Sequence, residues 1–308
     1  MNALVLGGNG FIGSHLVDRL LADGHAVRVF DLCGEKYRAA LPGVDYRYAH
    51  VRNHAVVSAA LDGIDVVFHL ISATVPQTSN DDPVHDVTAN LVETIHLLQG
   101  CVERRVKRFV FVSSGGTVYG RPNRLPVSED YPTDPECSYG IVKLAIEKYL
   151  HLFHHLSGLD YVVLRASNAY GPRQDPSGSQ GAVAVFLGKA ARGEVIPVWG
   201  DGRIVRDYVF VEDLADGIAR AGVLANSTRV FNLGSGRGHS LNSVLETIER
   251  VTGHKVRVQH MAGRVFDIPS IYLDIERARR DLSWQPRTAL EDGIRRTWEF
   301  VGGFLSNR

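Results

Sequence analysis

Cysteine is scarce in this chain, and neither sign of charge is in excess. The three cysteines, Cys33, Cys101 and Cys137, are odd in number and show no Cys-x-x-Cys spacing. This pattern argues against a disulfide-stapled secreted fold and predicts a reduced, cytoplasmic compartment. Lysine and arginine total 34, as do aspartate and glutamate. A balanced chain has no overall field to attract nucleic acid or an anionic membrane, and we expect neither partner.

Long apolar runs are absent as well. The longest, such as residues 64–71, are far shorter than the roughly 20 residues of a membrane-spanning helix. The N-terminus has no basic flank before its apolar stretch, so residues 3–6 predict a buried strand rather than a signal peptide. The 308 residues suffice for a sizeable core.

Short apolar runs alternate with amphipathic stretches through the first half of the chain. This alternation predicts a Rossmann-type α/β fold, a doubly wound parallel sheet with helices on both faces. The expected strands are residues 3–6, 27–30, 65–70, 109–112 and 161–164, and the expected helices are residues 14–22, 88–103 and 139–156. Gly24 is expected to close the first helix in a left-handed conformation.

The first expected strand runs directly into a glycine-rich turn, Gly7-Gly8-Asn9-Gly10-Phe11-Ile12-Gly13, and a helix follows. Glycines at these positions permit the tight turn, the approach of a pyrophosphate to the backbone and close packing of helix on strand. The free N–H groups at the start of the helix favour a phosphate there. The pattern therefore predicts a dinucleotide site.

The second expected strand ends at Asp31, which is placed to accept a hydrogen bond from a ribose hydroxyl. A carboxylate there repels the additional phosphate of NADP. Arg28 and Arg38 are near in sequence but are not where a phosphate clamp is expected. The sequence therefore predicts NAD as the cofactor.

The regular alternation weakens after Gly171, which predicts a smaller C-terminal substrate-binding lobe. The proline-rich segment 121–136 is expected to be a connector. We expect residues 1–170 plus about 205–230 to form the NAD-binding domain. Residues of about 171–204 plus 231–308 are expected to form the lobe.

Tyr139 and Lys143 stand four residues apart at the start of a predicted helix, so they share one face. A tyrosine has an ordinary pKa of about 10, and we expect the neighbouring ammonium to lower it. Such a tyrosine can exchange a proton with a substrate hydroxyl while a nicotinamide exchanges a hydride. Ser113 and Ser114 lie at the end of a strand upstream, at the sheet edge where parallel sheets bind ligands.

These motifs resemble those of the extended short-chain dehydrogenase/reductases, and within them the UDP-galactose (UDP-glucose) 4-epimerases and related NAD-dependent sugar-nucleotide epimerases. The likeness covers nearly the whole chain and is more specific for the family than for the reaction. The matching motifs are the glycine signature, Phe68-His69-Leu70, Ser113-Ser114, Val118-Tyr119-Gly120, Tyr139 with Lys143, Arg165 through Asn168, Tyr170-Gly171-Pro172-Arg173, Gly200-Asp201-Gly202, Arg206-Asp207-Tyr208-Val209, Glu212-Asp213, Arg264, Asp267, Asp274 and Leu282-Ser283-Trp284-Gln285-Pro286.

The resemblance implies NAD-dependent epimerisation at C4 of a nucleotide-diphosphate sugar, of the UDP-glucose/UDP-galactose type, through a transient 4-keto intermediate. It assigns Tyr139 as acid/base, Lys143 as its tuner and Ser114 as a further catalytic hydroxyl. The implied cofactor-binding residues are Gly7, Gly10, Phe11, Ile12, Gly13, Asp31, Leu32, Leu70, Ser113, Tyr139 and Lys143. The implied substrate-binding residues are Ser114, Asn168, Trp199, Arg206, Arg264 and Asp267. It also implies a homodimer formed through the helices at residues 88–103 and 139–156.

The chain departs from the family pattern at a few positions. Gly115 stands where the family usually has serine or threonine, so the partner of the sugar hydroxyl is Ser114 or, after a local shift, Thr117. His50 stands where an aspartate often holds the adenine. Gly115-Gly116 replaces the acidic residue of dehydratases and decarboxylases, which argues against elimination or decarboxylation.

Two other functions stay open at this point. A sugar-nucleotide 4-ketoreductase would release oxidised cofactor at each turnover. A catalytically weak NAD-binding regulatory protein is suggested by Gly115, although Tyr139 and Lys143 argue against it. His151, His154 and His155 have helical metal-ligand spacing, but no carboxylate completes a site and we expect no metal.

Overall fold

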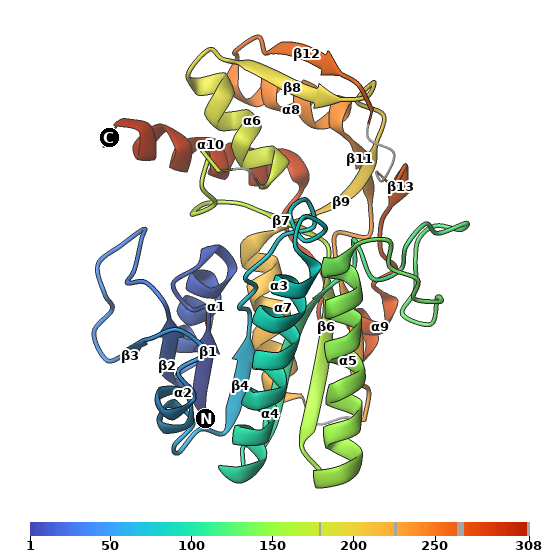
Figure 1. Ribbon diagram of the computed structural model, residues 1–308. Coiled ribbons are helices and arrows are strands. Elements are labelled where there is room, and N and C mark those ends of the chain that lie inside the picture. Colours follow the sequence, from blue (N-terminus) through green and yellow to red (C-terminus); the bar gives the residue numbers. More distant parts are fainter. Residues whose placement is uncertain (179, 225–226, 264–267, 307–308) are drawn as a thin grey trace.

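The computed structural model describes residues 1–178, 180–224, 227–263 and 268–306, which form two stacked parts (Figure 1). One part contains a seven-stranded sheet in which every neighbouring pair is parallel. Its strands are, in spatial order, β10 (Val230–Leu233), β6 (Asp160–Ala166), β5 (Arg108–Ser114), β4 (Val66–His69), β1 (Asn2–Leu6), β2 (Ala26–Asp31) and β3 (Asp45–Tyr48). The predicted Rossmann-type sheet is confirmed.

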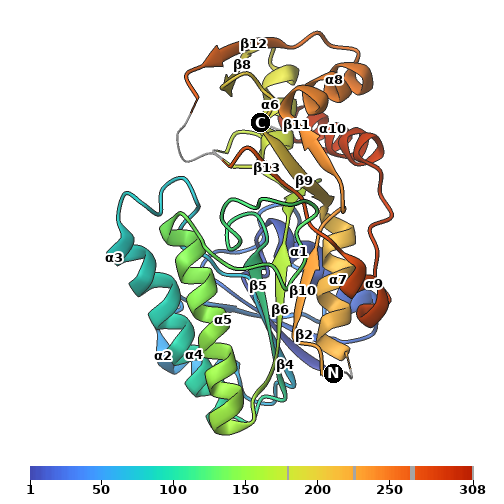
Figure 2. The same ribbon diagram turned by 90° about the vertical axis from the view of Figure 1, so that its right-hand side faces the viewer.

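Helices cover both faces of this sheet (Figure 2), and the central strands β1 and β4 are accordingly buried and mostly apolar. On one face lie α2 (His54–Ala60), α3 (Pro83–Asp86), the π-helical turn η1 (Val87–Val92), α4 (Glu93–Glu103) and α5 (Ser138–Ser157). On the other face lie α1 (Phe11–Ala22), α7 (Val211–Val223) and α9 (Glu276–Leu282). The first helix is followed by Gly24 with a φ of +77°, as predicted.

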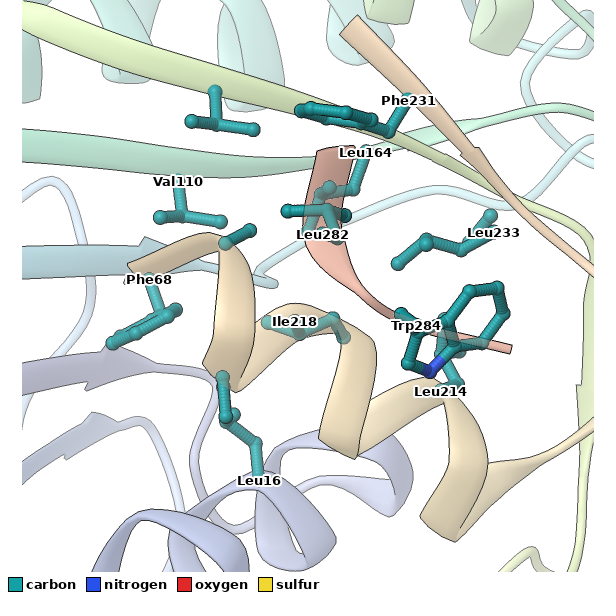
Figure 3. Close-up of a cluster of buried hydrophobic side chains, with 14 of the residues drawn as sticks. Leu16, Phe68, Val110, Leu164, Leu214, Ile218, Phe231, Leu233, Leu282 and Trp284 are labelled. Atoms are coloured by element: carbon teal, nitrogen blue, oxygen red, sulfur yellow. The ribbon is translucent and has the colours of Figure 1, made fainter. Parts of the chain in front are cut away.

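The core on the α1 and α7 face is built from segments far apart in the sequence (Figure 3). Leu16 of α1 and Ile218 of α7 pack there with Phe68 of the sheet, and all three are fully buried. Trp284, just after α9, joins the same cluster, and its indole N–H donates to the carbonyl of Asp213 at 2.8 Å. The C-terminal third of the chain therefore returns to the large sheet.

The second part carries two small sheets and three helices beyond the carboxyl ends of the large-sheet strands (Figures 1 and 2). Its strands are β7 (Asn168–Tyr170), β9 (Val205–Phe210), β11 (Gly238–Ser240) and β13 (Ser270–Ile271) in one sheet, and β8 (Val195–Trp199) and β12 (Arg257–Met261) in the other. Its helices are α6 (Ala182–Ala191), α8 (Leu241–Thr252) and α10 (Leu290–Ser306). Two strands therefore lie on the other side of the expected domain boundaries. β9 was expected in the NAD-binding domain but lies in the small part, whereas β10 was expected mostly in the lobe but extends the large sheet.

Two elements near the N-terminus and one helical turn were not anticipated. The edge strand β3 has a polar sequence and is not buried, and the short helix α2 follows it. The predicted helix at 88–103 begins as the π-helical turn η1 before it continues as α4. Among the helices of the described residues, none has both the length and the apolar character needed to cross a membrane.

Candidate active site

A cleft of about 930 Å³ lies between the carboxyl edge of the large sheet and the small part. Parallel sheets bind ligands at this edge, where the loops that follow the strands converge. The cleft brings together most of the predicted site residues. Those that line it are Gly7, Gly10, Phe11, Ile12, Gly13, Leu70, Ser113, Ser114, Tyr139, Lys143, Asn168, Trp199 and Arg206.

The glycine turn between β1 and α1 has the geometry of a phosphate cradle. Gly7 has a φ of +83°, which favours glycine. A Cβ on Gly13 would lie 2.0 Å from the carbonyl oxygen of Gly7, so only glycine lets α1 approach the strand this closely. No side chain caps the start of α1, and its free N–H groups face the cleft end of the helix. This cradle fits the pyrophosphate of a dinucleotide.

Asp31 ends β2 beside the glycine turn. Its carboxylate accepts hydrogen bonds from the backbone N–H of Asn9 at 3.0 Å and of Cys33 at 3.3 Å. The side chain is partly exposed and does not line the cleft itself. The next residue, Leu32, is also outside the cleft lining and is 63% exposed. Roles for both in holding the adenosine end of a cofactor remain predictions.

The two arginines near Asp31 are engaged elsewhere. Arg28 donates to Asp45 at 2.6 Å, and Arg38 forms ion pairs with Asp18 and Glu35. A guanidinium held by carboxylates is a poor ligand for another anion, because binding would have to break these pairs. The surroundings of Asp31 therefore fit the 2′-hydroxyl of NAD better than the phosphate of NADP.

Tyr139 and Lys143 lie on the first turns of α5 and share one face, as predicted. The Lys143 ammonium is 5.5 Å from the centre of the Tyr139 ring and 4.8 Å from that of Phe111. It is buried and donates to the carbonyl of Val112 at 3.1 Å. Burial lowers the pKa of Lys143 to about 8, which Asp86 and Glu147 partly oppose.

The predicted lowering of the tyrosine pKa was wrong for this structure. Burial raises the pKa of the Tyr139 hydroxyl to about 12, with smaller contributions from Cys137 and Asp86 in the same direction. A hydrogen bond with Ser72 opposes this rise. The cost of removing water from a phenolate raises the pKa more than the positive charge of Lys143 lowers it, because the Lys143 ammonium donates to a backbone carbonyl instead of to the tyrosine.

The two serines that end β5 have different surroundings. The hydroxyl of Ser113 is buried and donates to Glu147 at 2.6 Å, whereas Ser114 lines the cleft and is partly exposed. Thr117 lines the cleft too, and its buried hydroxyl has no hydrogen-bond partner among the described residues. Ser114 is therefore placed to bond a substrate hydroxyl, whereas the buried Thr117 hydroxyl would need a local shift to do so.

A side chain at position 115 would point away from the cleft. A Cβ at this position would lie 2.6 Å from a methyl group of Leu273 and 3.0 Å from the carbonyl oxygen of Arg165. Leu273 is only 1% exposed. A serine at position 115 would thus enter the packed core, so this backbone offers no place here for the hydroxyl that the family usually has.

The small part supplies the other wall of the cleft. Asn168 on β7 donates to the carbonyl of Asp207 at 3.1 Å. Arg206 on β9 donates to the carbonyl of Ile268 at 2.6 Å. Trp199 ends β8 and is 37% exposed. Arg264 and Asp267, also predicted to hold the substrate, lie outside the described residues.

The cleft also contains residues that the sequence did not single out. Ser72, Gln77 and Asn80 come from the segment between β4 and α3, which has no regular pattern. Glu136 borders the cleft just before Tyr139. The sequence offers one indication that these residues belong to the site: they are polar, and they either follow the end of a buried parallel strand or precede the tyrosine.

Comparisons with known proteins agree with this geometry. Residues 3–234 match the family described as the NAD dependent epimerase/dehydratase family. The UDP-glucose 4-epimerase of Mycolicibacterium smegmatis is 39% identical over 97% of this chain and 98% of that protein. The structure of the Thermotoga maritima UDP-glucose 4-epimerase with UDP-glucose has a TM-score of 0.94 at 35% identity, covering 99% of this chain and 100% of that one. The Thermus thermophilus UDP-glucose 4-epimerase, solved with NAD, has a TM-score of 0.92 at 34% identity, covering 98% and 99%.

A parallel sheet with a glycine cradle and a Tyr–Lys pair at its carboxyl edge defines a dinucleotide-dependent enzyme of the short-chain dehydrogenase/reductase type. The chain belongs to the NAD dependent epimerase/dehydratase family. The predicted family and the predicted cofactor are confirmed.

Proposed function

We propose that this chain interconverts the C4 epimers of a nucleotide-diphosphate sugar of the UDP-glucose/UDP-galactose type. The observation that carries the proposal is the meeting of the glycine cradle with Tyr139, Lys143 and Ser114 in one cleft. Its volume of about 930 Å³ is at the upper end of ordinary ligand pockets, as two large ligands require. The relatives named UDP-glucose 4-epimerase support the choice of reaction.

The two walls of the cleft divide the binding work in this proposal. The sheet-edge residues hold NAD, with Asp31 at the adenosine ribose and Lys143 at the nicotinamide ribose. Bound NAD supplies the chemistry of accepting a hydride and returning it. Asn168, Trp199 and Arg206 hold the nucleotide of the sugar, because an arginine binds phosphate oxygens with two parallel hydrogen bonds. Arg264 and Asp267 are proposed to complete this site.

Tyr139 acts as the acid/base in this mechanism. In its phenolate form, its oxygen takes the proton of the sugar C4 hydroxyl while the 4-keto sugar forms, and the resulting hydroxyl returns the proton when the sugar has turned over. With a pKa of about 12, the phenolate needs nearby positive charge, and Lys143 is the charge that the chain itself supplies. Ser114 donates a hydrogen bond to the same sugar oxygen and holds it near Tyr139.

The test is to incubate the purified protein with UDP-glucose and no added cofactor. UDP-galactose is expected to form without any net change in NADH, because the hydride is returned in every cycle. Tyr139→Phe keeps the ring but removes the hydroxyl, and is expected to lower the rate by about 10²–10⁴. A requirement for added reduced cofactor would instead identify a ketoreductase. Inactivity toward every nucleotide sugar, despite NAD binding, would identify a non-catalytic protein.

We also propose that the protein is a homodimer that pairs through the outer face of α3, η1 and α5. Val84, Val87, Ile141 and Leu152 on these elements are all at least 40% exposed. Exposed apolar side chains gathered on neighbouring helices are typical of a two-fold interface.

A further inference from the structure

Asp86 is a fully buried carboxylate beneath the first turn of α5. It is 0% exposed and is the last residue of α3, where the chain enters η1. One of its oxygens accepts hydrogen bonds from the hydroxyl of Thr74 at 2.6 Å and from the side-chain amide of Asn90 at 2.8 Å. Its other oxygen accepts from the hydroxyl of Ser138 at 2.6 Å. All three donors are neutral.

A buried carboxylate is costly to maintain, even when it is hydrogen-bonded, unless a positive charge lies close. In the described part of the chain, Asp86 forms no ion pair within 4.0 Å. An asparagine has the same shape and would also bond hydroxyl groups. Packing alone therefore does not account for a charged residue at this position.

Among the described residues, Lys143 is the cation whose pKa this charge raises. Three other titratable groups face the ammonium: Glu147 and Tyr139 on α5, and His69 on β4. Burial lowers the pKa of His69 to about 3, so this ring is neutral. Glu147 is paired with Arg165 at 2.7 Å, which balances its charge. The unbalanced negative charge near Lys143 is therefore that of Asp86.

Asp86 also fixes the position of the tyrosine. Ser138, which bonds Asp86, is the first residue of α5 and immediately precedes Tyr139. The backbone N–H of Ser138 donates to the side chain of Asn80 at 2.9 Å, and Asn80 lines the cleft. Asp86 thus joins the first turn of α5 to the segment that borders the cleft beside Tyr139.

We propose that Asp86 is a positioning residue for the epimerisation: its bond to Ser138 holds the first turn of α5 and thus Tyr139 in place, and its negative charge acts on Lys143 of the same helix. This inference rests on the proposed function. The carboxylate opposes the effect of burial on the pKa of Lys143, and it raises the pKa of Tyr139 and of Cys137, the other groups that face it. Removing its charge should lower all three pKa values.

The first test is Asp86→Asn, measured as kcat/KM against pH. The alkaline limb is set by loss of the Lys143 proton, whose pKa is about 8. Without the opposing charge, this limb is expected to move to lower pH by about 1 unit. Asp82→Asn is the matched control, because Asp82 is an exposed residue that caps the same helix by accepting from His85 N–H. Its profile is expected to match that of the unmodified protein.

The second measurement does not depend on activity. The protein is labelled with ¹³C at the lysine Cε, and the Lys143 signal is assigned by its loss in Lys143→Arg. Its titration midpoint is expected to fall in Asp86→Asn and not in Asp82→Asn. An unchanged midpoint in Asp86→Asn would overturn the proposal. If the midpoint moves but no nucleotide sugar is epimerised, the proposed function has failed while the electrostatic pairing stands.

Ser138→Ala covers the case in which Asp86→Asn does not fold. This variant keeps the buried charge and removes only the hydroxyl that joins it to the turn of Tyr139. We expect kcat to fall several-fold, with an unchanged pH profile and an unchanged Lys143 midpoint. A kcat equal to that of the unmodified protein would contradict the positioning role.

Discussion

Ser113 and Ser114 show how adjacent residues on one strand take different tasks. Successive side chains of a strand point to opposite faces, so the hydroxyl of Ser113 reaches Glu147 in the interior while Ser114 reaches the cleft. Ser113 satisfies a buried carboxylate that also pairs with Arg165. Its contribution is therefore to the stability of the site floor, whereas Ser114 is free to contact a substrate.

This division leads to a prediction for three single variants. Ser114→Ala is expected to lower kcat by about tenfold, the effect of losing one hydrogen bond to a charged or developing oxyanion, with little change in melting temperature. Ser113→Ala should instead lower the melting temperature, because Glu147 loses a donor. If Ser114→Ala kept full activity and Thr117→Val lost activity, the hydroxyl that bonds the sugar oxygen would be that of Thr117. This hydroxyl has no hydrogen-bond partner among the described residues.

Asp31 is the residue that we expect to set the choice between NAD and NADP. Asp31→Ala removes both the acceptor for the ribose hydroxyls and the repulsion of a 2′-phosphate. NAD binding is expected to weaken by about tenfold, and the preference over NADP should narrow without reversing, because Arg38 stays paired with Asp18 and Glu35. Calorimetric titration with both cofactors measures this, and a preference of the unmodified protein for NADP would refute it.

At the scale of elements, the turn after β5 explains the unusual Gly115. The position is packed against Leu273 in the buried cluster on the α1 and α7 face of the large sheet, so Gly115→Ser is expected to lower the free energy of unfolding by about 1–3 kcal/mol and not to raise the rate. Gly116→Ser is the matched control, because a Cβ there meets no atom within 4 Å. Chemical denaturation of both variants tests this, and equal stability of the two would contradict it.

Elements with a strong local pattern were predictable from the sequence, and those held by tertiary contacts were not. The strand ending at Leu6, the glycine turn and the helix containing Tyr139 follow from apolar runs and from glycine spacing. The edge strand β3 was not predicted because its side chains are not buried, so its sequence lacks an apolar run. The turn η1 escaped because its geometry depends on Asp86 and Asn90 reaching Thr74.

The chemistry of the site divides in the same way. Sequence spacing placed Tyr139 and Lys143 on one face, which the structure confirms. It gave the wrong direction for the tyrosine pKa because burial is a property of the folded cleft. The direction of Gly115 toward Leu273 was equally out of reach, since these residues are distant in the sequence.

At the scale of the whole molecule, one buried carboxylate ties the two parts together. Asp207 on β9 is 2% exposed. It accepts hydrogen bonds from the N–H groups of Ser235 at 2.7 Å and Leu273 at 3.2 Å. Ser235 follows β10 of the large sheet, so this carboxylate links the strand that carries Arg206 to the sheet that carries the glycine cradle. The Asp207 carboxylate therefore holds the strand of Arg206, at one wall of the cleft, against the end of the large sheet.

The outer face of α3, η1 and α5 carries exposed apolar side chains that have no role in joining the two parts of the molecule. These side chains support the dimer prediction. Ile141 and Leu152 are 54% and 42% exposed and about three turns apart on α5, so they point the same way. Light scattering at micromolar concentration is expected to give twice the mass of the chain. The double variant with Ile141→Glu and Leu152→Glu should be monomeric. A two-fold interface contains each substituted residue once from each subunit, so it would bury four unpaired carboxylates. Val223→Glu on α7, 57% exposed on the opposite side of the sheet, should remain dimeric, and an unmodified protein that is monomeric would refute the proposal.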